Sequence, residues 1–448
     1  MSSPVSVRQI DAVIQARWIV PVEPANVVLE GHALAIDDGE ILAVLPVEQI
    51  EQRFQPKKTT VLPHHVLMPG LVNLHTHAAM SLLRGYADDK PLMSWLQDHI
   101  WPAEATHVSP RFVRDGTLLA AAEMLRGGVT CFSDMYFFPE AAAEAALKAG
   151  IRAALGLVVF EFPSAYGADA DDYFAKGLAA RDRLRDEDTI SFCLAPHAPY
   201  TVSNKSFERI VTLAAQLDIP VHTHLHETHD EIAQGIKQYG VRPLQRLRQL
   251  GLLGSGLIAA HGVHLLPDEI VLLAEHGVHI AHCPTSNMKL ASGIAPVANM
   301  LSHGVNMGLG TDGAASNNRL DMFQEMRHAA LLGKVGSMDA AALPAHEVLQ
   351  MATLNGARAL GLGDRIGSLK AGKLADMCAV SLSDWITQPC FDPISHLVYV
   401  AGREQVSHVW VGGEQRLFDA ALICQSAQEL NEIAALWQNP IGTKKTRS

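Results

Sequence analysis

The sequence predicts an α/β protein, in which a (β/α)8 TIM barrel carries a small β-sandwich domain built from both chain ends. Three observations predict this fold. Eight apolar, strand-like runs alternate with Ala-, Leu- and Glu-rich helical runs through the middle of the chain. Short β-like runs separated by turn signals occupy both ends. The chain, at 448 residues, is long enough for a large barrel and an accessory domain.

The barrel elements can be placed in chain order. The predicted strands are Val66–Leu74, Val129–Met135, Ile151–Val159, Ile190–Ala195, Val221–Leu225, Leu257–Ala260, Val278–Ala281 and Val305–Leu309. The clearest helical runs between them are Phe112–Arg126, Glu140–Lys148, Ser206–Leu217 and Pro243–Leu250. We expect this alternation to give a closed parallel sheet surrounded by helices.

The chain ends have a different texture, with short runs of alternating residues. These β-like runs are Gln9–Val13, Trp18–Val20, His32–Ile36, Ile41–Val47, Gly367–Val380 and Val406–Leu417. A polar segment, Glu51–Lys57, precedes the barrel. We therefore expect residues 1–64 to form the first part of the sandwich, 65–365 the metal-dependent barrel, and 366–448 the second part of the sandwich plus a tail.

Composition restricts the function classes. Hydrophobic residues make up 48% of the chain and charged residues 18%, which is typical of a well-packed soluble protein. A net charge of -12, without a basic run beyond Lys444-Lys445, argues against nucleic acid or a membrane surface as partner. The six cysteines are scattered, and we find neither a signal peptide nor a membrane span. We expect a cytoplasmic protein with a small-molecule substrate.

The run that ends in His75-Thr76-His77 is the most informative stretch. Side chains two apart on a strand point to the same side, so both imidazoles can reach one point. Imidazole is a common ligand for zinc and other divalent metals. A single His-x-His pair is weak evidence, because two polar residues at the end of a strand are the more ordinary explanation. The other ligands must come from elsewhere in the chain.

Other predicted strands also end in groups that bind metals or transfer protons. Because a barrel places its chemistry at the carboxyl ends of its strands, these groups should meet at one rim. They are His75 and His77 on strand one, His197 on strand four, His222, His224 and His226 on strand five, His261 on strand six, His282 on strand seven and Asp312 on strand eight.

Histidines together with Asp312 would form a nitrogen and oxygen site that suits zinc, with iron or manganese as alternatives. Asp312 lies between glycines and could be an Asx turn, but its place after strand eight favours a ligand. Strand parity cannot choose among His222, His224 and His226. Glu227 is either a first-turn helix residue or a general acid/base beside the metal, and the sequence leaves both open.

With these residues the chain resembles the amidohydrolase superfamily, and within it the 5-methylthioadenosine/S-adenosylhomocysteine deaminases. The resemblance runs from Pro69 to Asp376. It rests on specific motifs: His75-Thr76-His77, His224-Leu225-His226-Glu227, Ala260-His261-Gly262-Val263-His264, His282-Cys283-Pro284-Thr285-Ser286-Asn287-Met288-Lys289-Leu290 and Gly310-Thr311-Asp312-Gly313.

The resemblance implies a zinc-dependent hydrolytic deaminase that converts adenosine-type nucleosides to the inosine analogue and ammonia. It implies one zinc ion per subunit, held by His75, His77, His224 and Asp312. It also implies catalytic roles for Glu227 as the proton shuttle, Asp312 as the group that takes up a proton from the attacking water and His261 as a hydrogen-bond partner of that water. The substrate-binding residues that it implies are Glu104 on the ribose hydroxyls, the histidine His197, the aromatic Trp95 near the purine, and Glu227. Dimers are frequent in the superfamily, so a homodimer is expected by analogy.

Two features of the chain refine this expectation. The end of strand four, Leu194 to His197, lacks the lysine that bridges two metals in some members of the superfamily, which favours one metal. Some relatives have arginines between strands three and four, but here none occurs from Val158 until Arg181. That absence favours methylthioadenosine over S-adenosylhomocysteine, whose tail carries a carboxylate.

Two other functions compete with this one. The same barrel could act on another ring, such as guanine, cytosine or a triazine, although Glu104 and His197 suit a ribose better than a free base. A non-catalytic barrel that serves as a binding module is the remaining alternative. Such a module would tend to lose metal ligands, and this chain keeps all those expected.

Overall fold

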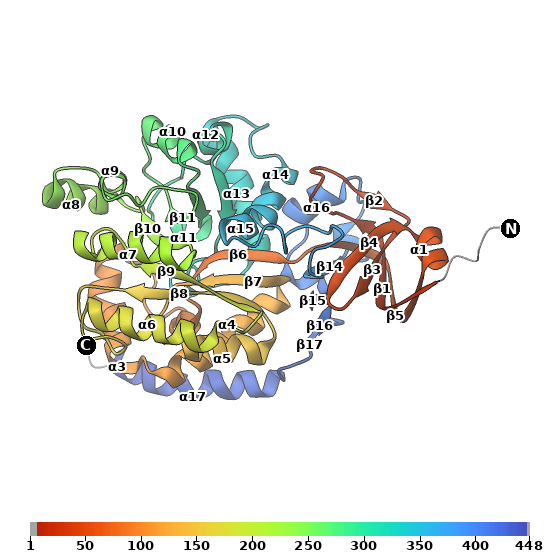
Figure 1. The fold of residues 1–448 in the computed structure, drawn as a ribbon, viewed down its shortest axis with the longest axis horizontal. Coiled ribbons are helices and arrows are strands. Elements are labelled where there is room, and N and C mark those ends of the chain that lie inside the picture. Colours follow the sequence, from red (N-terminus) through yellow and green to blue (C-terminus); the bar gives the residue numbers. More distant parts are fainter. Residues whose placement is uncertain (1–6, 446–448) are drawn as a thin grey trace.

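The computed structural model describes residues 7–445 and shows a (β/α)8 barrel beside a separate sheet made from both chain ends (Figure 1). The predicted fold class is therefore confirmed. The barrel sheet has eight strands in sequential order, and every paired neighbour is parallel. These strands are β6 (Leu71–Thr76), β7 (Val129–Asp134), β8 (Arg152–Val159), β9 (Ile190–Pro196), β10 (Val221–Leu225), β11 (Leu257–His261), β12 (His279–His282) and β13 (Asn306–Leu309).

The barrel strands read as continuous apolar runs because both of their faces are covered, one by the barrel interior and one by helices. Several helices begin at a side chain that accepts a backbone N–H, as at Ser109, Ser203 and Thr228. The covering helices are α4 (Pro110–Arg126), α5 (Pro139–Ala149), α6 (Ala170–Leu184), α7 (Asn204–Leu217), α8 (His229–Tyr239), α9 (Pro243–Gln249), α10 (Pro267–Glu275), α11 (Pro284–Lys289), α12 (Val297–Ser302), α13 (Met322–Ser337), α14 (Ala345–Met351) and α15 (Leu354–Ala359).

The long connection after β6 contributes residues to the pocket at the carboxyl end of the barrel. It contains the 3-10 turn η1 (Ala78–Leu83), α2 (Leu92–Ser94), the π-helical segment η2 (Trp95–Ile100) and α3 (Trp101–His107). Irregular helix of this kind is frequent at functional sites, where it directs side chains into a cavity.

The barrel closes between its first and last strands through a side chain and one backbone contact. The Asn73 side chain donates to Thr311 Oγ1 at 2.8 Å and accepts from the Thr311 N–H at 2.9 Å. The Asp312 N–H donates to the His75 carbonyl at 2.9 Å. This closure brings the end of β13 directly beside the His-x-His pair.

The predicted first barrel strand is wrong in one respect, because Val66–Leu74 belongs to two strands. Its first part is the end of β5 (Phe54–Pro69), which pairs with the terminal sheet, and only the residues from Leu71 enter the barrel. Gly70 separates the two strands. A Cβ at Gly70 would lie 2.0 Å from Thr130 Oγ1, so the chain passes too close to β7 for any side chain.

Within residues 7–445 the terminal sheet has nine strands, with β5 and β1 at its centre. The C-terminal strands β14 to β17 lie on the β5 side, and β3 and β4 lie on the β1 side. The runs predicted at Gln9–Val13 and Trp18–Val20 merge into one strand, and part of the polar segment Glu51–Lys57 is helical. The elements are β1 (Arg8–Ile19), β2 (Leu29–Glu30), β3 (His32–Asp37), β4 (Glu40–Pro46), α1 (Val47–Arg53), β5, β14 (Met377–Ser381), β15 (Val406–Val411), β16 (Glu414–Phe418) and β17 (Ala421–Leu422).

The chain after residue 381 returns to the barrel through η3 (Trp385–Thr387), α16 (Pro393–Tyr399) and η4 (Arg403–Gln405). The last helix, α17 (Ala427–Lys445), runs along the outside of the barrel near α3, α4 and α5 (Figure 1). The Trp437 indole N–H of α17 donates to Asp115 Oδ2 on α4 at 3.0 Å. The Trp437 ring packs edge-on against Phe112. Among residues 7–445, no helix has the length and apolar character needed to cross a membrane.

Candidate active site

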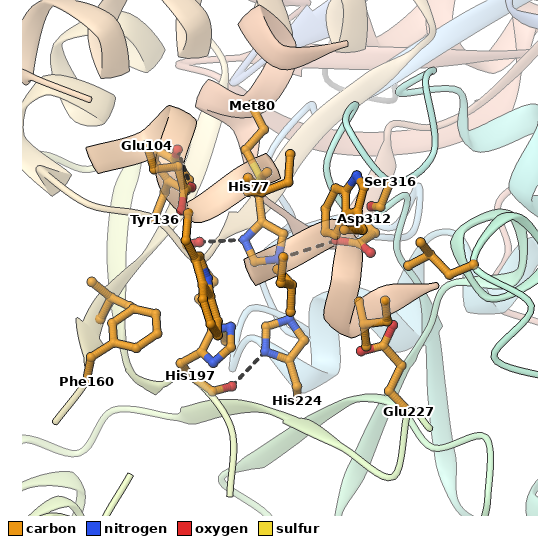
Figure 2. Close-up of a pocket in the computed structure, with 18 of the residues that line it drawn as sticks. His77, Met80, Glu104, Tyr136, Phe160, His197, His224, Glu227, Asp312 and Ser316 are labelled. Carbon is orange, nitrogen blue, oxygen red and sulfur yellow. Dashed lines mark hydrogen bonds and ion pairs between the residues drawn. The ribbon is translucent and has the colours of Figure 1, made fainter. Parts of the chain in front are cut away.

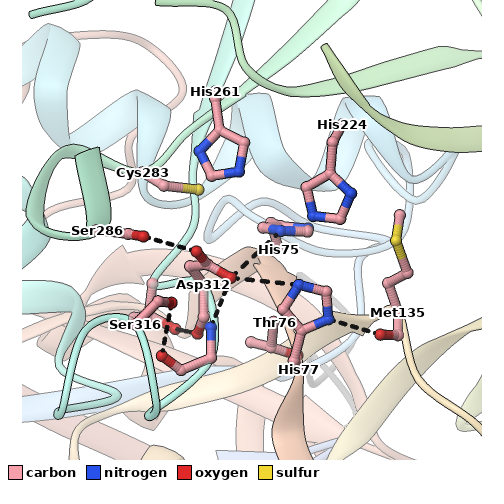
Figure 3. A network of polar contacts seen from close by, with 12 residues as sticks. His75, Thr76, His77, Met135, His224, His261, Cys283, Ser286, Asp312 and Ser316 are labelled. Carbon is pink, nitrogen blue, oxygen red and sulfur yellow. Dashed lines mark hydrogen bonds and ion pairs between the residues drawn. The ribbon is translucent and has the colours of Figure 1, made fainter. Parts of the chain in front are cut away.

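The ends of β6, β10, β11 and β13 bring four histidines and one aspartate together in the barrel mouth (Figure 3). Two overlapping groups have ligand atoms that all lie within 4.8 Å of one another: His75, His224 and His261 form one, and His75, His77 and Asp312 form the other. His75 belongs to both groups. The site therefore offers imidazole nitrogens and a carboxylate, the donor set expected for zinc.

Backbone carbonyls fix the orientation of two of these histidines. His77 Nδ1 lies 2.7 Å from the Met135 carbonyl, and His224 Nδ1 lies 2.6 Å from the His197 carbonyl. A carbonyl only accepts, so each Nδ1 must carry the hydrogen, and each Nε2 is left with a free lone pair. His77 Nε2 lies 3.3 Å from Asp312 Oδ1. Histidines that ligate metals are oriented in this way.

His75 is fully buried and takes its orientation from a second histidine. Its Nδ1 lies 3.0 Å from His222 Nε2, and His222 Nδ1 lies 3.3 Å from Ser133 Oγ. Its Nε2 is buried without a hydrogen-bond partner and lies 3.6 Å from Asp312 Oδ1. A buried polar nitrogen left unpaired is costly, and a metal ion would satisfy it. The residues present therefore fit a metal.

Asp312 is held in a left-handed conformation, with φ of 61°, that directs its carboxylate into the site. Oδ2 accepts from Ser286 Oγ at 2.7 Å, and Oδ1 accepts from the Gly313 N–H at 2.7 Å. Burial alone would raise the pKa of Asp312, but nearby His77 and His261 and the donated hydrogen bonds lower it below the ordinary value. The group is therefore an anionic carboxylate at neutral pH.

Glu227 and His261 lie beside this cluster. His261 Nε2 is 3.8 Å from Glu227 Oε2, and His261 Nδ1 is 2.9 Å from Asn287 Oδ1, which fixes the imidazole ring. Glu227 is 6% exposed, and this burial raises its pKa above the ordinary value. The Glu231 carboxylate accepts the Glu227 N–H at 2.8 Å and so holds the turn after β10. A carboxyl with a raised pKa in this place suits proton transfer.

A pocket extends from the cluster to α3 and to the aromatic side chains that follow β7 and β8 (Figure 2). Glu104 Oε1 accepts from the Tyr136 hydroxyl at 2.7 Å, and burial raises the pKa of Glu104 to about 7. The His197 ring stacks on Phe160 with centroids 4.6 Å apart, and Trp95 also lines the pocket. The four substrate-contact residues expected from the sequence, Glu104, His197, Trp95 and Glu227, all line this one cavity.

The structure separates the three histidines of strand five, which parity could not do. His224 reaches the cluster, whereas His222 lies deeper and contacts His75. His226 has φ of 53°, and its Nε2 accepts from the Leu244 N–H at 3.2 Å, outside the cavity. His282, expected at the same rim, is buried but belongs to neither of the two groups whose atoms could hold a metal.

Four residues that contact the cluster or the pocket received no role from the sequence. Ser286 binds Asp312 and Asn287 binds His261. Both lie in the motif from His282 to Leu290, so the motif itself was the available signal. Tyr136 binds Glu104, and its place just after a barrel strand was its only signal. His222 contacts His75, and the only signal for this contact in the sequence was strand parity.

The chain is similar in sequence and fold to known metal-dependent hydrolases. The amidohydrolase family pattern matches residues 66–416. The chain is 48% identical to a 5-methylthioadenosine/S-adenosylhomocysteine deaminase from Teredinibacter turnerae, over 97% of this chain and 99% of that protein. It is 51% identical to the crystal structure of an adenosine deaminase from Xanthomonas campestris with bound zinc, with a TM-score of 0.96 over 98% of this chain and 100% of that one. Atrazine chlorohydrolase from Arthrobacter aurescens, 24% identical with a TM-score of 0.87 over 95% and 99% of the two chains, shares the fold. The chain belongs to the amidohydrolase family.

Proposed function

We propose that this protein is a zinc-dependent hydrolytic deaminase that converts 5′-methylthioadenosine and related adenosine-type nucleosides to the inosine analogue and ammonia. One observation carries the proposal. The Nε2 atoms of oriented histidines and the Asp312 carboxylate face one point, next to Glu227 and His261, at the end of a cavity that also holds Glu104. The names and the extent of similarity of the relatives support the same chemistry.

We propose that His75, His77, His224 and Asp312 hold one zinc ion. The buried, unpaired Nε2 of His75 and the two Nδ1 atoms held by carbonyls support this ligand set. β9 ends at Pro196 and is followed by His197, without a lysine to bridge a second ion, which supports a single metal. When bound, the metal supplies Lewis-acid chemistry that makes water a nucleophile near neutral pH.

The remaining steps belong to side chains. The Asp312 carboxylate accepts a proton from the attacking water, and His261 Nε2 orients that water toward the purine carbon that bears the amino group. Glu227 delivers a proton to the adjacent ring nitrogen as the new C–O bond forms. The proton taken up by Asp312 passes to the amino group, the C–N bond breaks as the carbonyl forms, the hydroxyl proton returns to Glu227, and ammonia leaves. Glu227 is suited to this relay because its raised pKa lets it hold a proton that it can give up again.

The other end of the cavity suits a nucleoside. Glu104 would accept hydrogen bonds from the ribose hydroxyls, with Tyr136 holding one of its oxygens. His197 would contact the substrate from the stack that it forms with Phe160, and Trp95 would pack near the purine. A free base such as guanine or cytosine has no ribose hydroxyls to donate to Glu104.

An ammonia-release screen tests the proposal. The zinc-loaded protein is incubated with adenosine, methylthioadenosine, S-adenosylhomocysteine, guanine and cytosine, with Glu227→Gln as the matched inactive control. We expect release from the adenosine compounds and none from the free bases. Release from guanine or cytosine alone would replace the proposal by deamination of another ring.

Location and assembly complete the proposal. The six cysteines are free thiols, which favours a reducing compartment, so we propose a cytoplasmic location. We also propose a homodimer by analogy with the fold. Light scattering of the purified protein tests the oligomeric state.

A further inference from the structure

We infer that a side pocket next to Glu104 receives the group attached to the 5′ carbon of the nucleoside and selects apolar thioethers over charged tails. This side pocket is lined mainly by Trp101, Val108, Phe137, Phe160, Phe162 and Pro163. The inference rests on the proposed function and deepens it, because it states which adenosine-type nucleosides the site accepts.

The position of the side pocket follows from the residues that it shares with the main cavity. Trp101, Glu104, Phe137 and Phe160 line both spaces. With the purine at the metal end and the ribose hydroxyls at Glu104, the side pocket begins where the ribose ends. The 5′ substituent is the part of the substrate that reaches it.

The walls of the side pocket are aromatic and pack against one another. The rings of Phe160 and Phe162 have centroids 4.9 Å apart, and Trp101 and Phe162 have centroids 5.8 Å apart. Phe137 lies 5.8 Å from Phe160 by the same measure. Sulfur contacts aromatic rings favourably, so these walls suit a thioether.

Charge in the side pocket disfavours an amino-acid tail. The lining contains no Lys, Arg or His, and its only ionisable group is Glu104, which would repel a carboxylate. The lining has two other polar side-chain groups, the Trp101 indole N–H and the Ser164 hydroxyl. Ser164 Oγ already accepts from the Tyr173 hydroxyl at 2.5 Å and from the Tyr166 N–H at 3.0 Å. The nearby Lys176 ammonium is bound to Asp172 at 2.8 Å. A buried carboxylate without a partner is costly, and the carboxylate of the S-adenosylhomocysteine tail finds no cation in this lining.

A series of 5′ substituents tests the inference on the wild-type, zinc-loaded enzyme. Adenosine, methylthioadenosine, 5′-butylthioadenosine and S-adenosylhomocysteine are compared by kcat/KM for ammonia release. We expect adenosine to fall roughly 10- to 200-fold below methylthioadenosine, the range for a small missing apolar group. Butylthioadenosine, which has about the length of the homocysteine tail without its charges, should stay near methylthioadenosine. S-adenosylhomocysteine should fall at least about tenfold below butylthioadenosine.

A variant separates the side pocket from the rest of the site. Phe162→Ala removes a wall of the side pocket whose side chain is 36% exposed, so the fold should tolerate it. We expect methylthioadenosine to lose about tenfold in kcat/KM and adenosine, which has nothing in the side pocket, to keep its value. Phe391→Ala, at a residue 90% exposed and outside both pockets, is the matched control and should change neither.

The outcomes distinguish the inference from the proposed function. If S-adenosylhomocysteine matches or exceeds butylthioadenosine, or if Phe162→Ala lowers adenosine and methylthioadenosine equally, the inference is wrong while the deaminase proposal stands. If none of the adenosine compounds releases ammonia, the proposed function is wrong and the inference falls with it.

Discussion

Replacing His222 should weaken zinc binding although His222 is not a proposed ligand. If His75 Nε2 presents its lone pair to the metal, His75 Nδ1 must carry the hydrogen and donate it to His222 Nε2, 3.0 Å away. His222 in turn donates from Nδ1 toward Ser133 Oγ at 3.3 Å. Both histidines are 0% exposed, so water cannot replace the lost partner. His222→Leu therefore leaves a buried donor on His75 unpaired.

The magnitude follows from that unpaired donor. A buried, unsatisfied hydrogen-bonding group costs about 1–3 kcal/mol. At about 1.4 kcal/mol per tenfold change in an equilibrium constant, this corresponds to a zinc affinity lowered roughly 5- to 150-fold. Loss of a hydrogen-bond partner behind a metal ligand typically lowers metal affinity by about 10–100-fold, which agrees. His222→Gln keeps an acceptor and should recover much of the loss.

Competition with a chromophoric chelator measures the zinc dissociation constant, and ammonia release at saturating zinc measures turnover. His279→Leu is the matched control, because His279 lies at the opposite end of a barrel strand and contacts the Ser255 carbonyl at 3.0 Å. We expect weaker zinc binding in His222→Leu only. Unchanged zinc affinity in His222→Leu, or an equal loss in His279→Leu, would refute the reasoning.

The remaining predictions concern the proposed catalytic groups and the metal. Glu227→Gln should lower kcat by about 10²- to 10⁴-fold while bound zinc, measured by atomic absorption, stays at the wild-type level; wild-type turnover would exclude Glu227 as the proton shuttle. His77→Ala should lose zinc and activity together, and full zinc occupancy in that variant would contradict its place as a ligand. Removal of metal by a chelator should abolish ammonia release, and added zinc should restore it; activity that survives complete metal removal would argue against the proposed mechanism. Burial raises the pKa of Glu104 from 4.5 to about 7, so the folded state holds this proton more tightly and the free energy of unfolding falls as pH rises through that interval. In metal-free protein, Glu104→Gln should remove this loss, at most about 3 kcal/mol, and chemical denaturation at pH 5 and pH 8 should show a gain over wild type at pH 8 only.

The sequence predicted the barrel well. Strands covered on both faces must be apolar along their whole length, and the helices between them must place apolar residues at every turn on the face that packs against the sheet. It was less reliable where one apolar run serves two sheets. Val66 to Leu74 reads as a single strand, and only the close approach of Thr130 to Gly70 shows that the chain changes sheets there. The last helix, α17, lies in what was expected to be a tail. It is held by contacts such as that of Trp437 with Asp115, and these two residues are too far apart in the chain for the sequence to show that they meet.

For the site, the sequence by itself determined which chemical groups stand at the strand ends, because strand parity and the placement of carboxyl ends follow from local geometry. It could not decide how deep each group lies or which neighbour it meets. His222 and His224 share a strand face, yet His222 lies against His75 and Ser133 while His224 reaches the open end of the barrel. Only the closed barrel decided this, since each ring is oriented by atoms from other strands: the carbonyls of Met135 and His197, and the side chains of Ser286 and Asn287.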